Sequence, residues 1–241
     1  MDIFAHRGNS GEAPENTFAA FRQVQDAGAD GVEFDVQLSR DGVPVVINDE
    51  RLERTTSGTG WVRDHTLAEL QALDAGRWFA PDFAGERIPT LREVLEFFRA
   101  TDLRIHIELK TRRFFYPGLA KLVIDHIKEF DLGPRVVVSS FNHMSLEEAR
   151  ALNPQLEYAV LSSDPMIEPW RYVREHGFQA FHPSVTVVDE ALVKGCHGAG
   201  LRLRPWVVDD PSDVARMEAL GADGIYSNHP RRFAGRATRT G

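Results

Sequence analysis

Three acidic residues lie in strand-like segments where they could bind a metal ion or move protons. Glu33 and Asp35 alternate with apolar residues, so both carboxylates share one face of a strand. Glu108 has the same relation to Ile105 and Ile107 in a second segment. A buried carboxylate needs a partner, and for one residue alone an ion pair with Arg or Lys is the simpler interpretation. The i, i+2 pair favours a metal ion, and three carboxylates without Cys or His at metal spacing favour Mg²⁺ or Ca²⁺ over zinc.

Other polar residues follow predicted strands. His6 and Arg7 end the first strand-like segment, ahead of Gly8 and the stretch Pro14-Glu15-Asn16-Thr17. Lys110 stands beside Glu108 and suits an anionic substrate such as a phosphate ester, although an ordinary Glu–Lys pair is the simpler alternative. Phe141 and Trp206 lie at or near later strands. Aromatic residues in strands usually belong to a core, but at the mouth of a barrel they would line a substrate pocket.

The elements that must position these residues alternate between short β-branched runs and amphipathic stretches, a pattern typical of parallel βαβ units. The expected strands are 3–6, 31–38, 43–48, 104–110, 135–140, 157–161, 180–183, 203–208 and 224–227. The expected helices are 16–27, 91–100, 117–130, 144–152, 167–176, 189–199 and 211–220. Thr90 with Glu93 predicts a capping box, and Asp210-Pro211 predicts a helix start. We predict a single α/β domain over residues 1–241, a (β/α)₈ TIM barrel, with a doubly wound open sheet as the alternative.

The second and third strands are too close in sequence for a parallel crossover, and Asp41-Gly42 predicts a two-residue hairpin turn between them. With that turn, Asp35 would lie opposite Asn48, and Glu33 opposite Glu50. Residues 51–89 do not fit a βα unit, and we expect them to form an inserted subdomain after the hairpin. Its four large aromatic residues could cap a pocket or pack against another subunit.

The composition excludes several classes of protein. The 241 residues carry 28 Lys and Arg against 36 Asp and Glu, a net charge of −8, so binding to a nucleic acid backbone is not expected. No apolar run reaches the roughly 20 residues of a membrane span, and the first residues do not resemble a signal peptide. The one cysteine, Cys196, is expected in the core, as is usual in a reducing compartment. We therefore expect a cytoplasmic protein.

Taken together, the motifs resemble the glycerophosphodiester phosphodiesterase family. The resemblance rests, in order along almost the whole chain, on His6-Arg7-Gly8, Pro14-Glu15-Asn16-Thr17, Val32-Glu33-Phe34-Asp35-Val36, Asp41-Gly42, Ile107-Glu108-Leu109-Lys110 and Ala222-Asp223-Gly224. It implies a metal-dependent (β/α)₈ barrel with an insertion after its second motif. It also implies cleavage of glycerophosphodiesters, such as glycerophosphocholine or glycerophosphoethanolamine, to glycerol 3-phosphate and an alcohol.

The resemblance also implies roles for individual residues. It makes Glu33, Asp35 and Glu108 the ligands of one divalent cation, Mg²⁺ or Ca²⁺. The remaining roles are a phosphate site at Arg7 and Lys110, a catalytic histidine at His6, and a pocket for the glycerol end lined by Phe141 and Trp206.

One position departs from the family pattern. Where the family has its second catalytic histidine, immediately before an aspartate, this chain has Asn48-Asp49. An amide cannot exchange a proton near neutral pH, and positioned acid–base catalysis contributes roughly 10²–10⁴-fold to a rate. Three explanations stay open: an engineered His→Asn change that traps a ligand, which we favour because the other motifs are intact; a natural variant with another acid; or a binding protein without catalysis. The closing Ser227-Asn228, where relatives often have an acidic residue, is a smaller departure.

We therefore predict a phosphodiesterase acting on a small-molecule diester, with activity impaired by Asn48. The main alternative is a catalytically inactive phosphodiester-binding protein on the same scaffold. A second alternative is a related barrel lyase, which would use the substrate's own hydroxyl to release a cyclic phosphate. No feature of the sequence predicts the oligomeric state.

Overall fold

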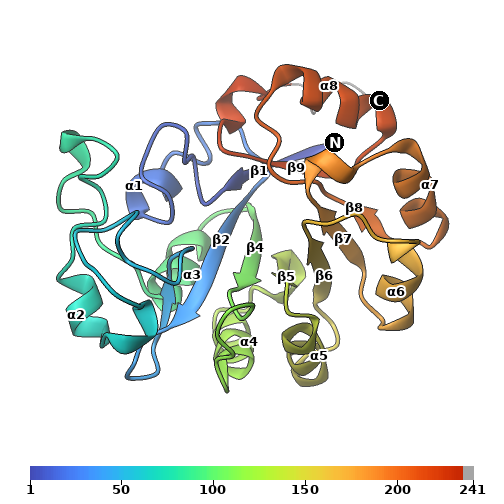
Figure 1. The fold of residues 1–241 in the computed structure, drawn as a ribbon. Helices are drawn as coiled ribbons and strands as arrows, with labels where there is room; N and C mark the ends of the chain where they lie inside the picture. The colour runs from blue at the N-terminus through green and yellow to red at the C-terminus, as the bar shows by residue number, and fades with distance from the viewer. Residues whose placement is uncertain (236–241) are drawn as a thin grey trace.

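The barrel expected from the alternating pattern is present. The computed structural model describes residues 1–235, and over these residues eight parallel strands with helices between them form a nearly closed barrel (Figure 1). The parallel strands are β1 (Asp2–His6), β2 (Gly31–Leu38), β4 (Arg104–Leu109), β5 (Val136–Ser140), β6 (Glu157–Ser162), β7 (Ala180–Pro183), β8 (Arg202–Leu203) and β9 (Gly224–Ser227). They pair in the order β8-β7-β6-β5-β4-β2-β1-β9. The barrel prediction is confirmed, and the doubly wound alternative is wrong.

The barrel closes between β8 and β9 through irregular backbone rather than a regular ladder. Val208 N–H donates to Tyr226 O at 2.8 Å, and Tyr226 N–H donates to Pro205 O at 3.0 Å. Pro205 has no N–H of its own, so a regular ladder cannot run through it. For this reason β8 ends at Leu203, whereas the sequence predicted a strand over 203–208.

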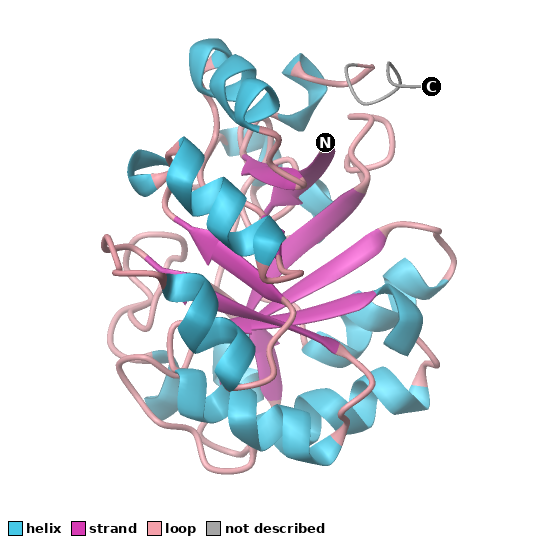
Figure 2. Cartoon of the chain, turned by 90° about the vertical axis from the view of Figure 1, so that its right-hand side faces the viewer, coloured by secondary structure: helices cyan, strands magenta, loops and turns pink. Residues whose placement is uncertain are grey.

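Helices surround the strands (Figure 2). They are α1 (Phe18–Phe21), α2 (Leu67–Gln71), α3 (Leu91–Arg99), α4 (Leu119–Glu129), α5 (His143–Leu152), α6 (Pro169–Glu175), α7 (Glu190–Gly198) and α8 (Pro211–Leu220). Short 3₁₀ helices span Val62–Asp64, Pro81–Phe83, Gly133–Arg135, Val185–Val187 and Pro230–Arg232. The capping box of Thr90 and Glu93 and the N-cap at Asp210 are confirmed. Within residues 1–235, no helix has both the length and the apolar character that a bilayer span requires.

Helix α1 is much shorter than the helix predicted over 16–27. The Ala20 carbonyl, which in a continuous helix would accept from Val24 N–H, accepts from Asn9 N–H at 3.2 Å instead. Val24 N–H turns to Phe21 O at 3.2 Å, and the chain continues in tight turns to Gly28. The loop after β1 thus binds the backbone of α1 and ends the helix early.

The hairpin register differs from the prediction by one residue. Strand β3 (Pro44–Val46) pairs antiparallel with β2, with Val36 opposite Val46, so Asp35 and Asn48 are not cross-strand partners, and neither are Glu33 and Glu50. The turn has three residues rather than two, because Ser39 N–H bonds Val43 O at 3.0 Å around a left-handed Gly42. Asn48 lies beyond the end of β3, where the strand no longer dictates the direction of its side chain.

Residues 51–89, which include α2, lie beside β2 on the side of the barrel where α1 lies (Figure 1). They share a second apolar cluster with the hairpin: Val45, Ile47, Leu52, Val62, Leu70, Ala75 and Ile88. Trp61 packs edge-on against Phe114 in the loop after β4, with ring centroids 5.2 Å apart. The division into one domain over residues 1–241, with 51–89 as an inserted subdomain, stays a prediction. Residues 236–241 of that predicted domain lie outside the described part of the chain.

Candidate active site

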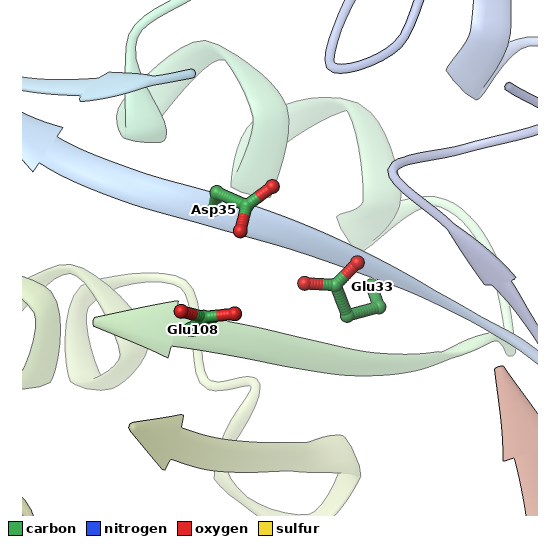
Figure 3. A group of neighbouring side chains, drawn as sticks. All are labelled: Glu33, Asp35 and Glu108. Carbon is green, nitrogen blue, oxygen red and sulfur yellow. The ribbon is translucent and has the colours of Figure 1, made fainter. Parts of the chain in front are cut away.

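Three carboxylates converge at the carboxyl ends of two neighbouring strands. Glu33 and Asp35 project from β2 and Glu108 from β4, in the register that sets Asp35 beside Glu108 (Figure 3). One ligand oxygen from each lies within 4.8 Å of the others. The side chain of Asp35 is only 1% exposed. The alternation in both strands therefore does bring these three residues together, as the sequence predicted.

The three carboxyl groups differ in charge balance. Burial raises the pKa of Glu33 well above its usual value, and the charges of Asp35 and Glu108 raise it further. Burial also raises the pKa of Glu108, against the opposing effect of Lys110. At Asp35 burial would raise the pKa, but Arg7 and Lys110 outweigh it and lower the pKa. Asp35 is thus held ionised by two cations, while burial and the neighbouring negative charge favour the protonated forms of Glu33 and Glu108.

Arg7 reaches the cluster from a strained turn after β1. Its φ is +58°, in the left-handed region, and its N–H donates to Glu33 Oε2 at 3.0 Å. Its side-chain Nε lies 3.3 Å from Asp35 Oδ2. Gly8, which follows at φ +81°, lets this turn pack on α1, because a Cβ there would meet the Ala20 Cβ at 2.7 Å. The glycine serves the approach to the helix.

Lys110 supplies a second cation at the end of β4. Its Nζ lies 2.9 Å from Glu108 Oε1 and 3.6 Å from Asp35 Oδ1. Burial would lower the pKa of Lys110, but these two carboxylates outweigh it and raise the pKa. The ammonium therefore stays charged beside the cluster, where an anionic group would find it.

Asn16 belongs to the site although the sequence analysis assigned it no role. Its φ is +57°, and its Nδ2 donates to Asp35 Oδ2 at 2.9 Å. Asparagine tolerates the left-handed conformation better than most residues, so the turn can present this amide to the carboxylate. The signal was present in Pro14-Glu15-Asn16-Thr17, but a contact across 19 positions cannot be inferred from spacing.

His6 is oriented by two residues from the far end of the chain. Asn228 Nδ2 donates to Asp209 Oδ2 at 2.7 Å, which fixes the amide so that its Oδ1 faces His6 Nδ1 at 2.8 Å. Burial lowers the pKa of His6 to about 4, so the ring is neutral near pH 7 and its one proton lies on Nδ1. Nε2 is left with its lone pair, 4.0 Å from Glu33 Oε2. His6 is thus set to accept a proton at Nε2.

Loss of this acceptor has a measurable consequence. In an Asn48→His form, we expect Asn228→Leu to slow turnover about tenfold, the lower range for partners that orient a functional imidazole. The ¹⁵N shifts of His6 should then report mixed tautomers. Asn228→Asp keeps an acceptor and should keep the Nδ1–H tautomer. A Leu variant with unchanged ¹⁵N shifts and rate would contradict this role for Asn228.

Asn48 contacts the acidic cluster despite the register shift. Its Nδ2 donates to Asp35 Oδ1 at 2.8 Å. Gln37 holds the backbone there, since its Nε2 donates to the carbonyls of Ile47, Asn48 and Asp49 at 2.7 to 3.1 Å. Asn48, which the resemblance sets at the family's second histidine position, therefore lies at the cluster.

The rings of Phe141 and Trp206, the two predicted pocket aromatics, contact each other, but only Trp206 lines the cavity at the acidic cluster. Trp206 lines a cavity of about 20 Å³ together with His6, Glu33 and Glu108. Phe141 is not among the residues lining that cavity, and its ring meets the Trp206 ring edge-on at 5.5 Å. The Trp206 indole is fixed by a bond from Nε1 to His182 O of 2.8 Å. Trp206 thus lines the cavity, while Phe141 supports it.

Two buried histidines form a polar layer in the barrel. His106 Nδ1 and Tyr226 Oη are hydrogen-bonded, and Tyr226 Oη lies 3.0 Å from His182 Nδ1. Arg204 Nη1 lies 3.3 Å from His182 Nε2 and, because a guanidinium only donates, makes that nitrogen the acceptor. Tyr226 and His182 also line the Trp206 cavity. The sequence analysis assigned His182 no role.

Fold and site together define a class: a (β/α)₈ barrel enzyme with an acidic cluster and basic residues at the carboxyl ends of its strands. Residues 6–232 match the model of the glycerophosphoryl diester phosphodiesterase family, and the chain belongs to that family. The resemblance stated above is therefore confirmed, as is the prediction of a phosphoric diester hydrolase.

Named relatives cover nearly the whole chain. A glycerophosphodiester phosphodiesterase of Caldanaerobacter subterraneus subsp. tengcongensis is 44% identical over 228 residues, covering 95% of this chain and 94% of that protein. One from Bacillus altitudinis is 40% identical over 233 residues, covering 95% of each. Among solved structures, an Oleispira antarctica phosphodiesterase in complex with the product sn-glycerol-3-phosphate is 32% identical, with a TM-score of 0.87, covering 96% of this chain and 94% of that one.

Proposed function

We propose that this chain hydrolyses glycerophosphodiesters such as glycerophosphocholine or glycerophosphoethanolamine, with one divalent cation, and releases glycerol 3-phosphate and an alcohol. The observation that carries the proposal is the convergence of Glu33, Asp35 and Glu108 oxygens within 4.8 Å, beside the free Nε2 of His6. The product named for the Oleispira antarctica structure supports the same product here.

The donor set fits a hard divalent ion. When all three carboxyl groups are ionised they exceed the two cations Arg7 and Lys110 by one negative charge, and a bound phosphodiester would add another. A divalent cation would balance both. Carboxylate oxygens are the ligands that Mg²⁺ and Ca²⁺ prefer. When bound, the ion would polarise the phosphoryl group and lower the pKa of an attacking hydroxyl or water.

The remaining residues divide the substrate between them. Arg7 and Lys110 would hold the phosphate, because both are partly exposed cations at the edge of the acidic cluster. Trp206, with Phe141 behind it, would pack against the glycerol end. The pocket then has a charged side and an aromatic side, as a phosphodiester with a glycerol group requires.

Proton transfer would be unequal between the two sides of the phosphate. His6 is neutral with Nε2 unprotonated and would accept the proton of the attacking group. Asn48 would stand where the leaving alcohol needs a proton, but its amide cannot donate one near neutral pH. The leaving alcohol would depart without a positioned acid, and we propose that this impairs turnover in this chain.

Two contacts favour a second candidate function, a phosphodiester-binding protein without catalysis. Asn48 donates to Asp35 Oδ1 at 2.8 Å and Asn16 to Asp35 Oδ2 at 2.9 Å, so the cluster is held by amides that bind without exchanging protons. In either case we propose a small-molecule ligand and no nucleic acid. We also propose a cytoplasmic location, because the one cysteine, Cys196, is free and buried.

Ion-dependent product release tests the proposal. Glycerol 3-phosphate should appear from glycerophosphocholine when Mg²⁺ or Ca²⁺ is added to the Asn48→His form, and chelation should stop it. The unaltered chain under the same conditions measures the impairment. Product release that continues undiminished with a chelator would overturn the metal dependence, and release in neither form with intact diester bound tightly would favour the binding protein.

A further inference from the structure

Arg54, in the inserted segment 51–89, lies at the edge of the active site. Arg54 binds Glu15 with two hydrogen bonds, Nη1 to Oε2 and Nη2 to Oε1, both 2.7 Å. The same guanidinium binds Asp49, Nε to Oδ2 at 2.6 Å and Nη2 to Oδ1 at 2.9 Å. Two paired contacts of this kind define the plane and position of all three groups.

Glu15 is shared between Arg54 and the site. Its Oε1 also accepts from Arg7 Nη1 at 2.9 Å, and Arg7 Nε in turn lies 3.3 Å from Asp35. The side chain of Glu15 is 11% exposed, whereas that of Arg54 is 44% exposed. A chain of alternating charges therefore runs from the surface insertion to the buried cluster.

The charge on Glu15 has two possible effects on Arg7. If Glu15 had no other partner, it would pair fully with Arg7 and reduce the attraction of that guanidinium for an anion. Because Arg54 also pairs with Glu15, the carboxylate can orient Arg7 while part of its charge is balanced by Arg54. The same Arg54 guanidinium also binds Asp49, the neighbour of Asn48. Arg54 therefore contacts a residue next to Asn48 as well as the partner of Arg7.

We propose that Arg54 is a positioning residue of the active site: by balancing and fixing Glu15, it keeps Arg7 oriented and electrostatically available for the substrate phosphate. The proposal rests on the proposed function, since it assumes that Arg7 binds phosphate. It gives the insertion a part in phosphate binding without direct contact with the substrate.

The test is the affinity for sn-glycerol 3-phosphate, measured by calorimetry with Mg²⁺ present on variants whose folding is checked by circular dichroism. Arg54→Gln should weaken binding about tenfold, equivalent to one well-placed charge contact, and Arg54→Lys should fall between it and the unaltered chain. Arg51→Gln is the matched control, because Arg51 is in the same insertion and also pairs with a carboxylate, that of Glu53. It should leave the affinity within about twofold, as an exposed pair does.

A double variant separates positioning from general damage to the fold. If Arg54 acts through Glu15, Glu15→Gln combined with Arg54→Gln should recover much of the affinity lost in Arg54→Gln alone, because the unbalanced charge of Glu15 then no longer competes with the phosphate for Arg7. In the Asn48→His background, Arg54→Gln should raise KM more than it lowers kcat. A double variant no better than Arg54→Gln, or an Arg54→Gln affinity equal to that of Arg51→Gln, would overturn the proposal.

Failure of the proposed function is recognised separately. If the unaltered chain binds no glycerol 3-phosphate, the proposed function fails, and this proposal fails with it. If the unaltered chain binds and Arg7→Gln binds equally well, the role of Arg7 is wrong, and so is the dependence on Arg54. If Arg7→Gln loses binding, the comparison of Arg54 with Arg51 decides the proposal alone.

Discussion

Replacing Asn48 with histidine is expected to raise the rate of glycerophosphodiester hydrolysis by roughly 10²–10⁴-fold, the range for a positioned acid or base. The position is suitable because Asn48 already donates to Asp35 at 2.8 Å, within the acidic cluster. An imidazole there could give a proton to the leaving alcohol, which the amide cannot. Steady-state release of glycerol 3-phosphate measures the effect.

The control for this gain is Asn48→Gln, which changes the size of the side chain but adds no proton carrier. It should be as slow as the unaltered chain or slower. If Asn48→His and Asn48→Gln turn over at the same low rate while both bind the diester, the missing histidine does not explain the impairment. Rapid turnover by the unaltered chain would show that another group already supplies the proton.

The second large effect is expected from Asp35→Asn. Asp35 is 1% exposed and lies near Arg7 Nε at 3.3 Å and Lys110 Nζ at 3.6 Å, so loss of its charge leaves two largely covered cations without this partner. In the Asn48→His form we expect the rate to fall roughly 10³-fold, beyond the 10–100-fold typical of residues behind a metal ligand. Without added ion, the free energy of unfolding should fall by about 3 kcal/mol, the size of a broken buried pair.

A carboxylate elsewhere serves as the control for Asp35. Asp125 on α4 is exposed and pairs with Lys121, so Asp125→Asn removes the same charge far from the cluster. We expect it to leave both the rate and the melting temperature nearly unchanged, since exposed pairs contribute little. An Asp35→Asn variant that behaves like Asp125→Asn would contradict the assignment of Asp35 to the site.

The pH dependence of the melting temperature, with and without added ion, reports on ion binding at the cluster. Burial and the charge of Asp35 raise the pKa of Glu33 and of Glu108, so protons compete with a cation increasingly as the pH falls. The rise in melting temperature caused by Mg²⁺ or Ca²⁺ should therefore be larger at pH 8 than at pH 6. Without added ion, the melting temperature itself should be higher at pH 6 than at pH 8. A carboxyl group with a raised pKa stabilises the fold at low pH and loses this effect as the pH rises through that pKa. Asp35→Asn should show little ion-induced shift at either pH.

The parts of the site that follow from local patterns could be predicted from the sequence. Strict alternation along β2 sends Glu33 and Asp35 to one face, and the same alternation in β4 does this for Glu108. The barrel follows from the regular succession of strands and helices. These inferences need only neighbouring residues and one repeated unit.

The parts of the fold and site that depend on tertiary contacts could not be predicted from the sequence. The hairpin register was wrong by one residue because a left-handed Gly42 supports a three-residue turn as readily as a shorter one. Helix α1 is short because Asn9 takes one of its carbonyls. The partners of His6 and Arg7, namely Asn228 and Glu15 with Arg54, come from segments whose meeting no periodicity predicts.

The most direct test of the central claim is phosphorus NMR of glycerophosphocholine incubated with the Asn48→His form and Mg²⁺ or Ca²⁺, beside the unaltered chain. The account predicts that the diester resonance is replaced by that of glycerol 3-phosphate, a linear monoester, quickly in the Asn48→His form and slowly or not at all in the unaltered chain. A cyclic phosphate as the final product, or an unchanged diester in the Asn48→His form with ion bound, would contradict it.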